Sequence, residues 1–439
     1  MKTKQQNLSI NINKSTSWLR RAKEVIPSAS QTYSKGYQYF CEGMAPAFLD
    51  RGEGGCVWDI DGNKYIDTVM ALGAVIIGYH HPEITETIQK QISKGLSFTL
   101  PTIGEVQLAE KIVELIPGAD MVRFVKNGSD ATTAAVKLAR AYTGRTLIAS
   151  CGYHGWHDWS IGLSENDRGV PEATKVLTLP FKYNDIEGLT ALFKAHPEQI
   201  AAVILEPIEL ELPQDDYLQK LRALTAQHGA LLIFDEVLSG FRFDLRGAGG
   251  YFKVVPDLVC FGKAIANGAD LSVVAGRRDV MKLIDEGVFV SMTFAGNAIP
   301  IVSAFKTLEI LEKPESYPYL WQLENRLIKG IDQLIIRHGL KEFAYTRSFP
   351  AHTALLFRSN QETLPAIDLQ SLFQQEALKR GVIYLGLHNL CLGHTQADID
   401  QILQAYEHAF QVVKKAIQEG NAAKHLEGQK IRPIFVRNG

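Results

Sequence analysis

The sequence has few cysteines, no surplus of charge and no long apolar run, and each shortage excludes a class of protein. Five cysteines occur in 439 residues, and no two are spaced as CxxC, so neither a disulfide framework nor a structural zinc site is expected. Lys and Arg total 46 and Asp and Glu 48, a formal net charge of −2, so the basic surplus typical of nucleic-acid-binding proteins is missing. The longest apolar run, 71–77, is far shorter than the ~18 residues a membrane helix needs.

The composition is that of an ordinary globular protein. Hydrophobic residues make up 46% of the chain and charged residues 21%, which is typical of folded rather than disordered chains. The polar N-terminus, 1–14, lacks the apolar core of a signal peptide. We therefore expect a cytoplasmic protein that acts on small molecules, with neither nucleic acid nor membrane as a partner.

The middle of the chain alternates between short apolar segments and helical patterns. Strands are predicted at 121–125, 146–150, 201–205, 230–234, 258–261 and 272–275, and helices at 131–142 and 218–227. Uninterrupted apolar strands separated by helices are typical of a mostly parallel sheet that is buried on both faces. The sequence therefore predicts an α/β fold.

The two ends of the chain have a different pattern. Short strands are predicted at 56–59 and 64–67, joined by a hairpin at Asp61-Gly62, and a long helix is predicted at 321–338. We predict a large domain at 70–310 and a smaller α+β domain formed by 1–69 and 311–420. Residues 421–439 are polar and are predicted to form a loose tail or to dock on a partner.

The first candidate for chemistry is the segment 124–132, where a strand turns into a helix. The N-terminus of a helix offers unbonded N–H groups and the positive end of the helix dipole, so it can bind an anion. Gly128 lets the backbone come close, and Ser129 adds a hydroxyl donor. The same residues also fit an ordinary helix cap, with Asn127 or Ser129 capping and Asp130 in the first turn.

Two further candidates follow apolar strands. Asp235 comes directly after the run 230–234, where a buried carboxylate needs a cationic partner such as Arg242. Lys263 follows the strand 258–261 and has apolar neighbours. Desolvation would lower the pKa of its amine and suit it to nucleophilic catalysis. The alternative for Lys263 is an exposed lysine in a loop.

These groups together meet the needs of one cofactor. Pyridoxal phosphate requires an anion site for its phosphate, a carboxylate for its pyridine nitrogen and a lysine for a Schiff base. Other cofactors fit less well. The glycines of 52–57 do not complete a GxGxxG motif, and the histidines of the segment 154–158 (His154, His157, followed by Asp158) have zinc-like spacing but no third placed ligand. No metal is expected.

The sequence resembles the class III aminotransferase family of fold-type I pyridoxal-phosphate enzymes, and in particular the aminotransferases similar to glutamate-1-semialdehyde aminomutase. The resemblance is carried by motifs that follow the family's order over about 20–410. They are 57–63, 78–82, 122–131, 140–145, 152–155, 205–207, 234–237, 240–242, 256–258, 262–263, 276–281 and 293–297. Each motif is weak alone, but the ordered set is specific.

The resemblance implies a large domain with a mostly parallel seven-stranded sheet and a smaller α+β domain built from both termini. By resemblance, Lys263 is the Schiff-base lysine, Asp235 is the partner of the pyridine nitrogen, and Tyr153 stacks on the cofactor ring. The other implied cofactor contacts are Asn127, Gly128, Ser129, His154, Glu206 and Thr293. Thr293 matches a threonine that reaches the cofactor phosphate of the other subunit, which implies a homodimer with shared sites.

The chain departs from the aminomutase where substrate selectivity is expected. The stretch 384–395 has Asn389 but no acid, and an aromatic segment with Trp156 and His157 replaces a Gly/Ser-rich gating loop. The remaining substrate candidates are Thr32, Lys35 and Glu211. These differences favour a ping-pong aminotransferase that acts on a polar carbonyl compound of biosynthesis, a sugar-like compound being one example. The alternatives are an aminomutase and, from another class, a cofactor-free scaffold protein.

Overall fold

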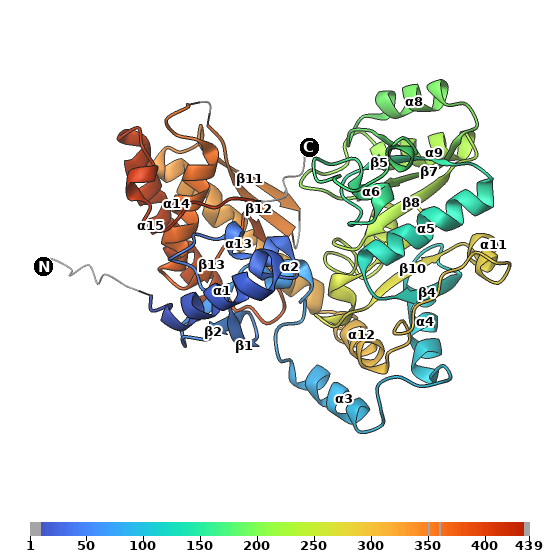
Figure 1. Cartoon of the computed structure of the whole chain (residues 1–439), viewed down its shortest axis with the longest axis horizontal. Helices are drawn as coiled ribbons and strands as arrows, with labels where there is room; N and C mark the ends of the chain where they lie inside the picture. Colours follow the sequence, from blue (N-terminus) through green and yellow to red (C-terminus); the bar gives the residue numbers. More distant parts are fainter. Residues whose placement is uncertain (1–9, 350–351, 360, 434–439) are drawn as a thin grey trace, which may run out of the picture. The chain divides into compact units, whose positions relative to one another are not determined.

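The computed structural model describes residues 10–349, 352–359 and 361–433, which divide into two compact units (Figure 1). The central unit contains 73–75 and 82–317. The terminal unit contains 10–72, 76–81 and the described residues from 318 to 433. Each unit therefore has to be understood from its own contacts.

The central unit is built on a seven-stranded sheet with the order β4-β10-β9-β8-β7-β5-β6. Its strands are β4 (Met121–Val125), β5 (Leu147–Cys151), β6 (Thr178–Pro180), β7 (Ile200–Leu205), β8 (Leu231–Glu236), β9 (Leu258–Phe261) and β10 (Ser272–Gly276). Only β10 runs antiparallel to its neighbours, and the pairs from β9 to β6 are all parallel. The predicted α/β fold with a mostly parallel sheet is confirmed.

The strands form where apolar residues run without interruption, because both faces of the sheet are covered. Every residue of β7 and of β8 is buried. Helix α5 (Gly128–Thr143) lies along one face of the sheet (Figure 1). Its buried alanines pack with strand residues in one apolar cluster, and their small side chains allow a close approach.

The predicted strands agree with the observed ones to within one or two residues, and 121–125 and 258–261 agree at both ends. Several elements of the central unit were not predicted, among them the three-residue strand β6, helix α8 (Ile186–Ala195) and helix α12 (Ala298–Leu311). The other helices of this part of the chain are α3 (Pro82–Ile92), α4 (Ile103–Leu115), α6 (Asp158–Ile161), α7 (Glu172–Lys175), α9 (Tyr217–Gln227), α10 (Gly247–Phe252) and α11 (Arg278–Met281).

The terminal unit holds two small sheets. One has the order β1-β2-β3-β13, with β1 (Leu49–Glu53), β2 (Cys56–Asp59), β3 (Lys64–Asp67) and β13 (Val382–Ile383). The other has β11 (Ala344–Phe349), β12 (His352–Phe357) and β14 (Leu387–His388). The predicted hairpin is confirmed: β2 pairs antiparallel with β3, and the Asp59 carboxylate accepts the N–H groups of Asp61 and Asn63 in the turn.

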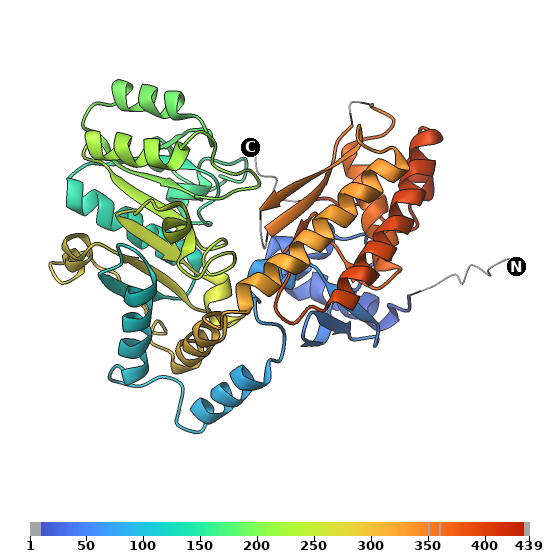
Figure 2. The same cartoon turned by 180° about the vertical axis from the view of Figure 1, so that it is seen from behind.

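Helices from both ends of the sequence complete this unit. They are α1 (Asn13–Val25), α14 (Ala366–Leu378) and α15 (Gln396–Gln418), together with α2 (Met70–Gly73) and α13 (Ser316–His338), which continue into the central unit. Helices α14 and α15 lie side by side (Figure 2). Within the described ranges, no helix is both long enough and apolar enough to cross a membrane.

The described part of the C-terminal tail is docked on the terminal unit. Gln429 forms a β-bridge with Glu42, and the backbone N–H of Ile431 donates to Ser371 Oγ. The side chain of Ile431 is buried. Up to residue 433, therefore, the tail is not loose but is fixed to its own chain.

Candidate active site

The predicted acid and lysine lie at the ends of neighbouring strands. In the parallel pair of β8 and β9, Asp235 is opposite Cys260 and Glu236 is opposite Phe261. Lys263 follows β9 after a single glycine. Since both strands end at the same edge of the sheet, the register brings Asp235 and Lys263 to one edge, the edge at which α/β sheets bind ligands.

Val237 joins this edge to the predicted anion site. A Cβ added to Gly128 would lie 2.7 Å from Val237 Cγ1, and one added to Gly262 would lie 3.2 Å from the same atom. The backbone N–H of Val237 donates to Asp235 Oδ1 over 3.0 Å. The turn before α5, the acid of β8 and the residue before Lys263 therefore meet around one side chain.

Asp235 is buried, with 4% of its surface exposed, and its partner is a histidine. His154 Nδ1 lies 2.7 Å from Asp235 Oδ2. An ionised carboxylate only accepts hydrogen bonds, so Nδ1 carries the proton in this pair. Arg242, the partner considered from the sequence, instead donates to the carbonyl of Val75. Asp235 thus accepts from two donors, the backbone N–H of Val237 at Oδ1 and His154 Nδ1 at Oδ2.

The loop that carries His154 is attached to the first turn of α5. Thr132 Oγ1 donates to the carbonyl of His154 over 2.7 Å, and the N–H of Trp156 donates to Ser129 Oγ over 3.2 Å. Gly155 has φ +106°, and a Cβ on it would lie 2.2 Å from Ser129 Oγ. Only glycine allows this approach, so the loop, the turn and Asp235 form one connected structure.

The turn 127–129 has the features of a helix cap as well as those of an anion site. Asn127 is the N-cap residue of α5, and its N–H donates to Asp130 Oδ2 over 2.8 Å. This is the ordinary cap considered from the sequence. The helix has 16 residues, and its N-terminal dipole end still points to the sheet edge where Asp235 lies, so the cap and an anion site are compatible.

Lys263 has an unusual backbone conformation. Its φ is +44°, a left-handed value that thirteen other described non-glycine residues share and that costs a non-glycine residue about 1–3 kcal/mol. It begins a short 3-10 helix (Lys263–Ala266) whose other residues are buried. Ser303 Oγ in α12 donates to the carbonyl of Ala266 over 2.8 Å and holds this turn. Lys263 is half-buried, so its exposure is intermediate between a desolvated lysine and an exposed lysine in a loop, the two possibilities considered from the sequence.

Glu236, next to Asp235, is also a buried acid, and the sequence alone does not show that the two carboxylates have different roles. Burial raises the pKa of the Glu236 carboxyl to about 7, although hydrogen bonds from backbone N–H groups act in the opposite direction. One of these donors is the N–H of Ala248, 2.7 Å from Oε2. Glu236 therefore acts as a cap for α10, while Asp235 faces His154.

The other candidates in the central unit lie in different environments. Glu206 is buried, and its Oε1 accepts from the N–H of Tyr153 over 3.4 Å, so it orients the Tyr153 backbone. Thr293 and Glu211 are exposed. His157 is bonded through Nδ1 to Thr133 Oγ1.

Three substrate candidates lie in the terminal unit. Thr32 and Lys35 are exposed in a segment of short 3-10 turns. Asn389, by contrast, has 2% of its surface exposed. Its Nδ2 donates to the carbonyl of Val69 over 3.2 Å, and its Oδ1 lies 2.7 Å from His352 Nδ1. Both ends of the Asn389 amide are therefore used inside its own unit, which favours a structural role over substrate contact.

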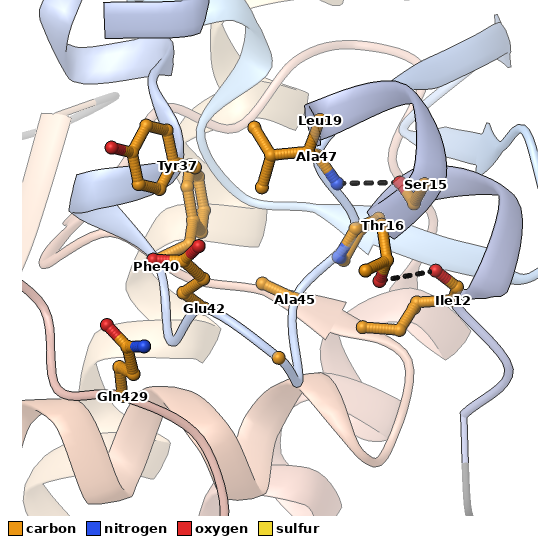
Figure 3. Close-up of a pocket in the computed structure, with 12 residues that line it drawn as sticks. Ile12, Ser15, Thr16, Leu19, Tyr37, Phe40, Glu42, Ala45, Ala47 and Gln429 are labelled. Atoms are coloured by element: carbon orange, nitrogen blue, oxygen red, sulfur yellow. Dashed lines mark hydrogen bonds between the residues drawn. The ribbon is translucent and has the colours of Figure 1, made fainter. Parts of the chain in front are cut away.

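The terminal unit also contains a cavity of about 250 Å³ (Figure 3). It lies between α1 and the segments that carry Tyr37, Glu42 and Gln429. Figure 3 shows mostly apolar side chains around it, and the Glu42 carboxylate is already paired with Lys23. No residue proposed for cofactor chemistry lines this cavity.

Comparison with known proteins places this geometry in context. Residues 39–414 match the family model described as aminotransferase class-III. The chain is 35% identical over 417 residues to 3-aminobutyryl-CoA aminotransferase of Cloacimonas acidaminovorans, covering 93% of this chain and 99% of the relative. It is also 35% identical over 400 residues to glutamate-1-semialdehyde 2,1-aminomutase of Syntrophobacter fumaroxidans, covering 85% and 92%. The solved FumI protein of Sphingopyxis sp. MTA144, in a form that carries pyridoxal phosphate, superposes with a TM-score of 0.85 at 30% identity, covering 92% of this chain and 97% of that one.

Proposed function

The chain belongs to the class III aminotransferase family, and we propose that it transfers an amino group from a small-molecule donor to a polar carbonyl compound, using Lys263. Like the rest of the family it is a fold-type I enzyme that depends on pyridoxal 5′-phosphate. The observation that supports the proposed site best is the meeting of Gly128, Asp235 and the backbone before Lys263 around Val237.

The residues present fit this cofactor. The turn 127–129 lacks room for a Cβ at Gly128, as expected where a backbone approaches a phosphate closely. Asn127, Gly128 and Ser129 would hold the phosphate, and Asp235 would hold the ring nitrogen. The His154 N–H keeps the Asp235 carboxylate oriented, so that its charge faces a fixed position.

The proposed chemistry divides between cofactor and protein. When bound, pyridoxal phosphate supplies a carbonyl carbon that reacts with amines and a ring that withdraws electrons. Lys263 Nζ would hold the cofactor and, when free, would take the proton from the substrate carbon that bears the nitrogen. Asp235 would hold the ring nitrogen in its protonated form, which would favour that proton transfer. The same groups would serve the carbonyl substrate in the second half of a ping-pong cycle.

The substrate is proposed to be polar, with a sugar-like carbonyl compound of biosynthesis as the leading example. The polar and aromatic groups at Trp156, His157 and Glu211 support this choice, and Thr32 and Lys35 are proposed as further substrate contacts. The relative named 3-aminobutyryl-CoA aminotransferase suggests a second substrate class, in which the amino group is on the carbon β to a carboxyl derivative.

We also propose a homodimer. The central unit exposes large apolar side chains from α3 to α4 and near Thr293, namely Ile92, Leu96, Phe98, Leu100, Ile103, Val106, Phe289 and Phe294. The two segments adjoin, because the N–H of Ala298 donates to the carbonyl of Leu96 over 2.8 Å. A patch of this kind on a soluble surface usually marks a protein interface. Thr293, exposed within it, would then reach the partner subunit's cofactor.

An aminomutase is the second candidate, because the chain is as similar to a protein of that name as to an aminotransferase. The two functions differ in their need for a second substrate. An aminotransferase given only a donor stops after one half-reaction, whereas a mutase turns over its single substrate continuously.

The test is a screen of amino donors with the purified, cofactor-loaded enzyme. We expect a donor such as glutamate to abolish the visible absorbance band of the cofactor, and a carbonyl compound to restore it. Lys263→Ala should lack both responses. Lys253→Ala is a matched control, because Lys253 also has a left-handed φ of +55° but is exposed. If Lys263→Ala retained the donor response, the proposed role of Lys263 would be wrong.

A further inference from the structure

The loop at 152–157 leaves one large apolar side chain uncovered beside the proposed phosphate turn. Trp156 is 67% exposed, although its backbone N–H is fixed to Ser129 Oγ. Its indole meets the ring of His157 edge to face, with centroids 4.9 Å apart and planes at 82°. A rigidly held, exposed tryptophan is the kind of side chain that contributes most to ligand binding.

The hydrogen bonds around His157 are compatible with a proton on Nε2. Trp159 Nε1 donates to Thr133 Oγ1 over 2.8 Å, and an indole N–H only donates. The Thr133 hydroxyl hydrogen can then be donated to His157 Nδ1, which is also 2.8 Å away. In that arrangement Nδ1 of the neutral ring is the acceptor and Nε2 carries the proton.

The Nε2–H group of His157 lies in a partly exposed position beside an acid. The distance from Nε2 to Asp130 Oδ1 is 3.8 Å, longer than a good hydrogen bond. The side chain of His157 is 28% exposed and that of Asp130 18%. A donor and an acceptor are thus presented to solvent next to a flat apolar ring, all attached to the first two turns of α5.

We propose that Trp156 and His157 bind the ring of a hydroxylated cyclic carbonyl substrate. This proposal rests on the proposed function and names its substrate class. The indole covers the C–H face of the substrate ring, His157 Nε2–H donates to one hydroxyl, and Asp130 accepts from another. An aromatic hydrocarbon would leave both polar groups unsatisfied, and an acyclic keto acid has no apolar face for the indole.

The test compares two carbonyl acceptors with the cofactor-loaded enzyme. One is a cyclic ketone that carries hydroxyl groups on adjacent carbons, and the other is pyruvate. We expect Trp156→Ala to raise KM for the cyclic ketone by about tenfold, the usual value of one aromatic contact, with a much smaller change for pyruvate. Trp18→Ala is the matched control, since Trp18 is 50% exposed but lies in α1.

Thr133→Val tests the positioning part of the proposal, because it removes the hydroxyl and keeps the shape of the side chain. His157 should then lose its fixed tautomer, so KM for the hydroxylated ketone should rise while kcat with pyruvate stays near the wild-type value. A second readout does not need turnover. Titration with the cyclic polyol that lacks the carbonyl should change the indole fluorescence of the wild type. This change should be absent in Trp156→Phe, which lacks the indole at this position.

The outcomes separate this inference from the proposed function. Loss of the cofactor band on adding an amino donor tests the function alone. If the band responds to donors but Trp156→Ala changes KM equally for both acceptors, or changes neither, the inference is overturned. It is also overturned if Trp156→Ala weakens dimer formation without affecting either KM, because the partner subunit would then cover the indole.

Discussion

Replacement of Gly128 by alanine tests whether the turn before α5 and Val237 together bind the cofactor. The added Cβ would lie 2.7 Å from Val237 Cγ1, 3.1 Å from Cγ2 and 3.4 Å from Cβ. Carbon atoms in contact prefer about 3.5–4.0 Å, so either the helix turn or Val237 must move. Val237 is held through its backbone N–H by Asp235 Oδ1, so movement there disturbs the group proposed for the ring nitrogen.

The expected magnitude follows from the cost of overpacking, about 1–3 kcal/mol. If this cost lowers the stability of the cofactor-bound Gly128→Ala protein, the dissociation constant for pyridoxal phosphate rises by about 5- to 150-fold. The contact with Val237 is present without the cofactor too, so we expect the folded apoprotein to be destabilised as well, less the ~1 kcal/mol by which alanine favours a helix over glycine.

The assay is a titration of the apoprotein with pyridoxal phosphate, followed by the visible absorbance band, for Gly128→Ala, Val237→Ala and the double variant. Val237→Ala removes both γ carbons and leaves the Cβ at 3.4 Å, an ordinary contact. The double variant should therefore bind the cofactor nearly as well as Val237→Ala alone, with a coupling energy of about 1–3 kcal/mol. The reasoning is refuted if Gly128→Ala costs the same in both backgrounds, or costs nothing.

Three further predictions concern stability and assembly. The pKa of Glu236 is raised to about 7, so the folded state holds this proton more tightly than the unfolded state. The resulting contribution to the free energy of unfolding, at most ~3 kcal/mol, is fully present below pH ~4.5 and is lost as the pH rises to about 7. Glu236→Gln should therefore flatten the fall of Tm over this pH range, and an unchanged pH profile would contradict the assignment. Ala71 in α2 has a left-handed φ of +52°, a conformation that favours glycine, so Ala71→Gly should leave Tm unchanged or raise it. Ala191→Gly, at an exposed position of α8, should instead lower the free energy of unfolding by about 1 kcal/mol. Leu100→Glu, in the proposed dimer patch, should halve the mass measured by sedimentation, and Val176→Glu, 58% exposed elsewhere in the unit, should not.

The fold could be predicted where the residues of a strand or helix themselves indicate its type and its ends. The strands at 121–125 and 258–261 were placed correctly because short apolar runs end at polar or glycine residues. Strand β6 was missed because it has three residues and ends in Pro180, and its existence depends on pairing with β5. Such a strand has too little intrinsic preference to be recognised before its partner is known.

The sequence proposes the candidate site as a set of residue types, but it does not indicate how these residues are connected. Asp235 and His154 are 81 residues apart in the sequence, so the choice of His154 over Arg242 as partner depends on the loop being fixed to α5. Val237 belongs to the motif 234–237, but its contacts were not predicted, because a valine at a strand end is usually a core residue. The left-handed φ of Lys263 was also invisible, since lysine has no preference for that conformation.

Asn389 shows why the surroundings of a substrate candidate are hard to predict from the sequence. Resemblance suggested a polar side chain facing the substrate, but the amide is bonded at both ends inside the terminal unit. Since its Nδ2 donates to the carbonyl of Val69, its oxygen is the atom that faces His352, and His352 Nδ1 must donate to it. A buried amide that is bonded at both ends is held in place by its own unit, which is typical of a structural role. The cofactor groups, in contrast, follow from strand ends and a helix N-terminus, whose positions the sheet itself determines.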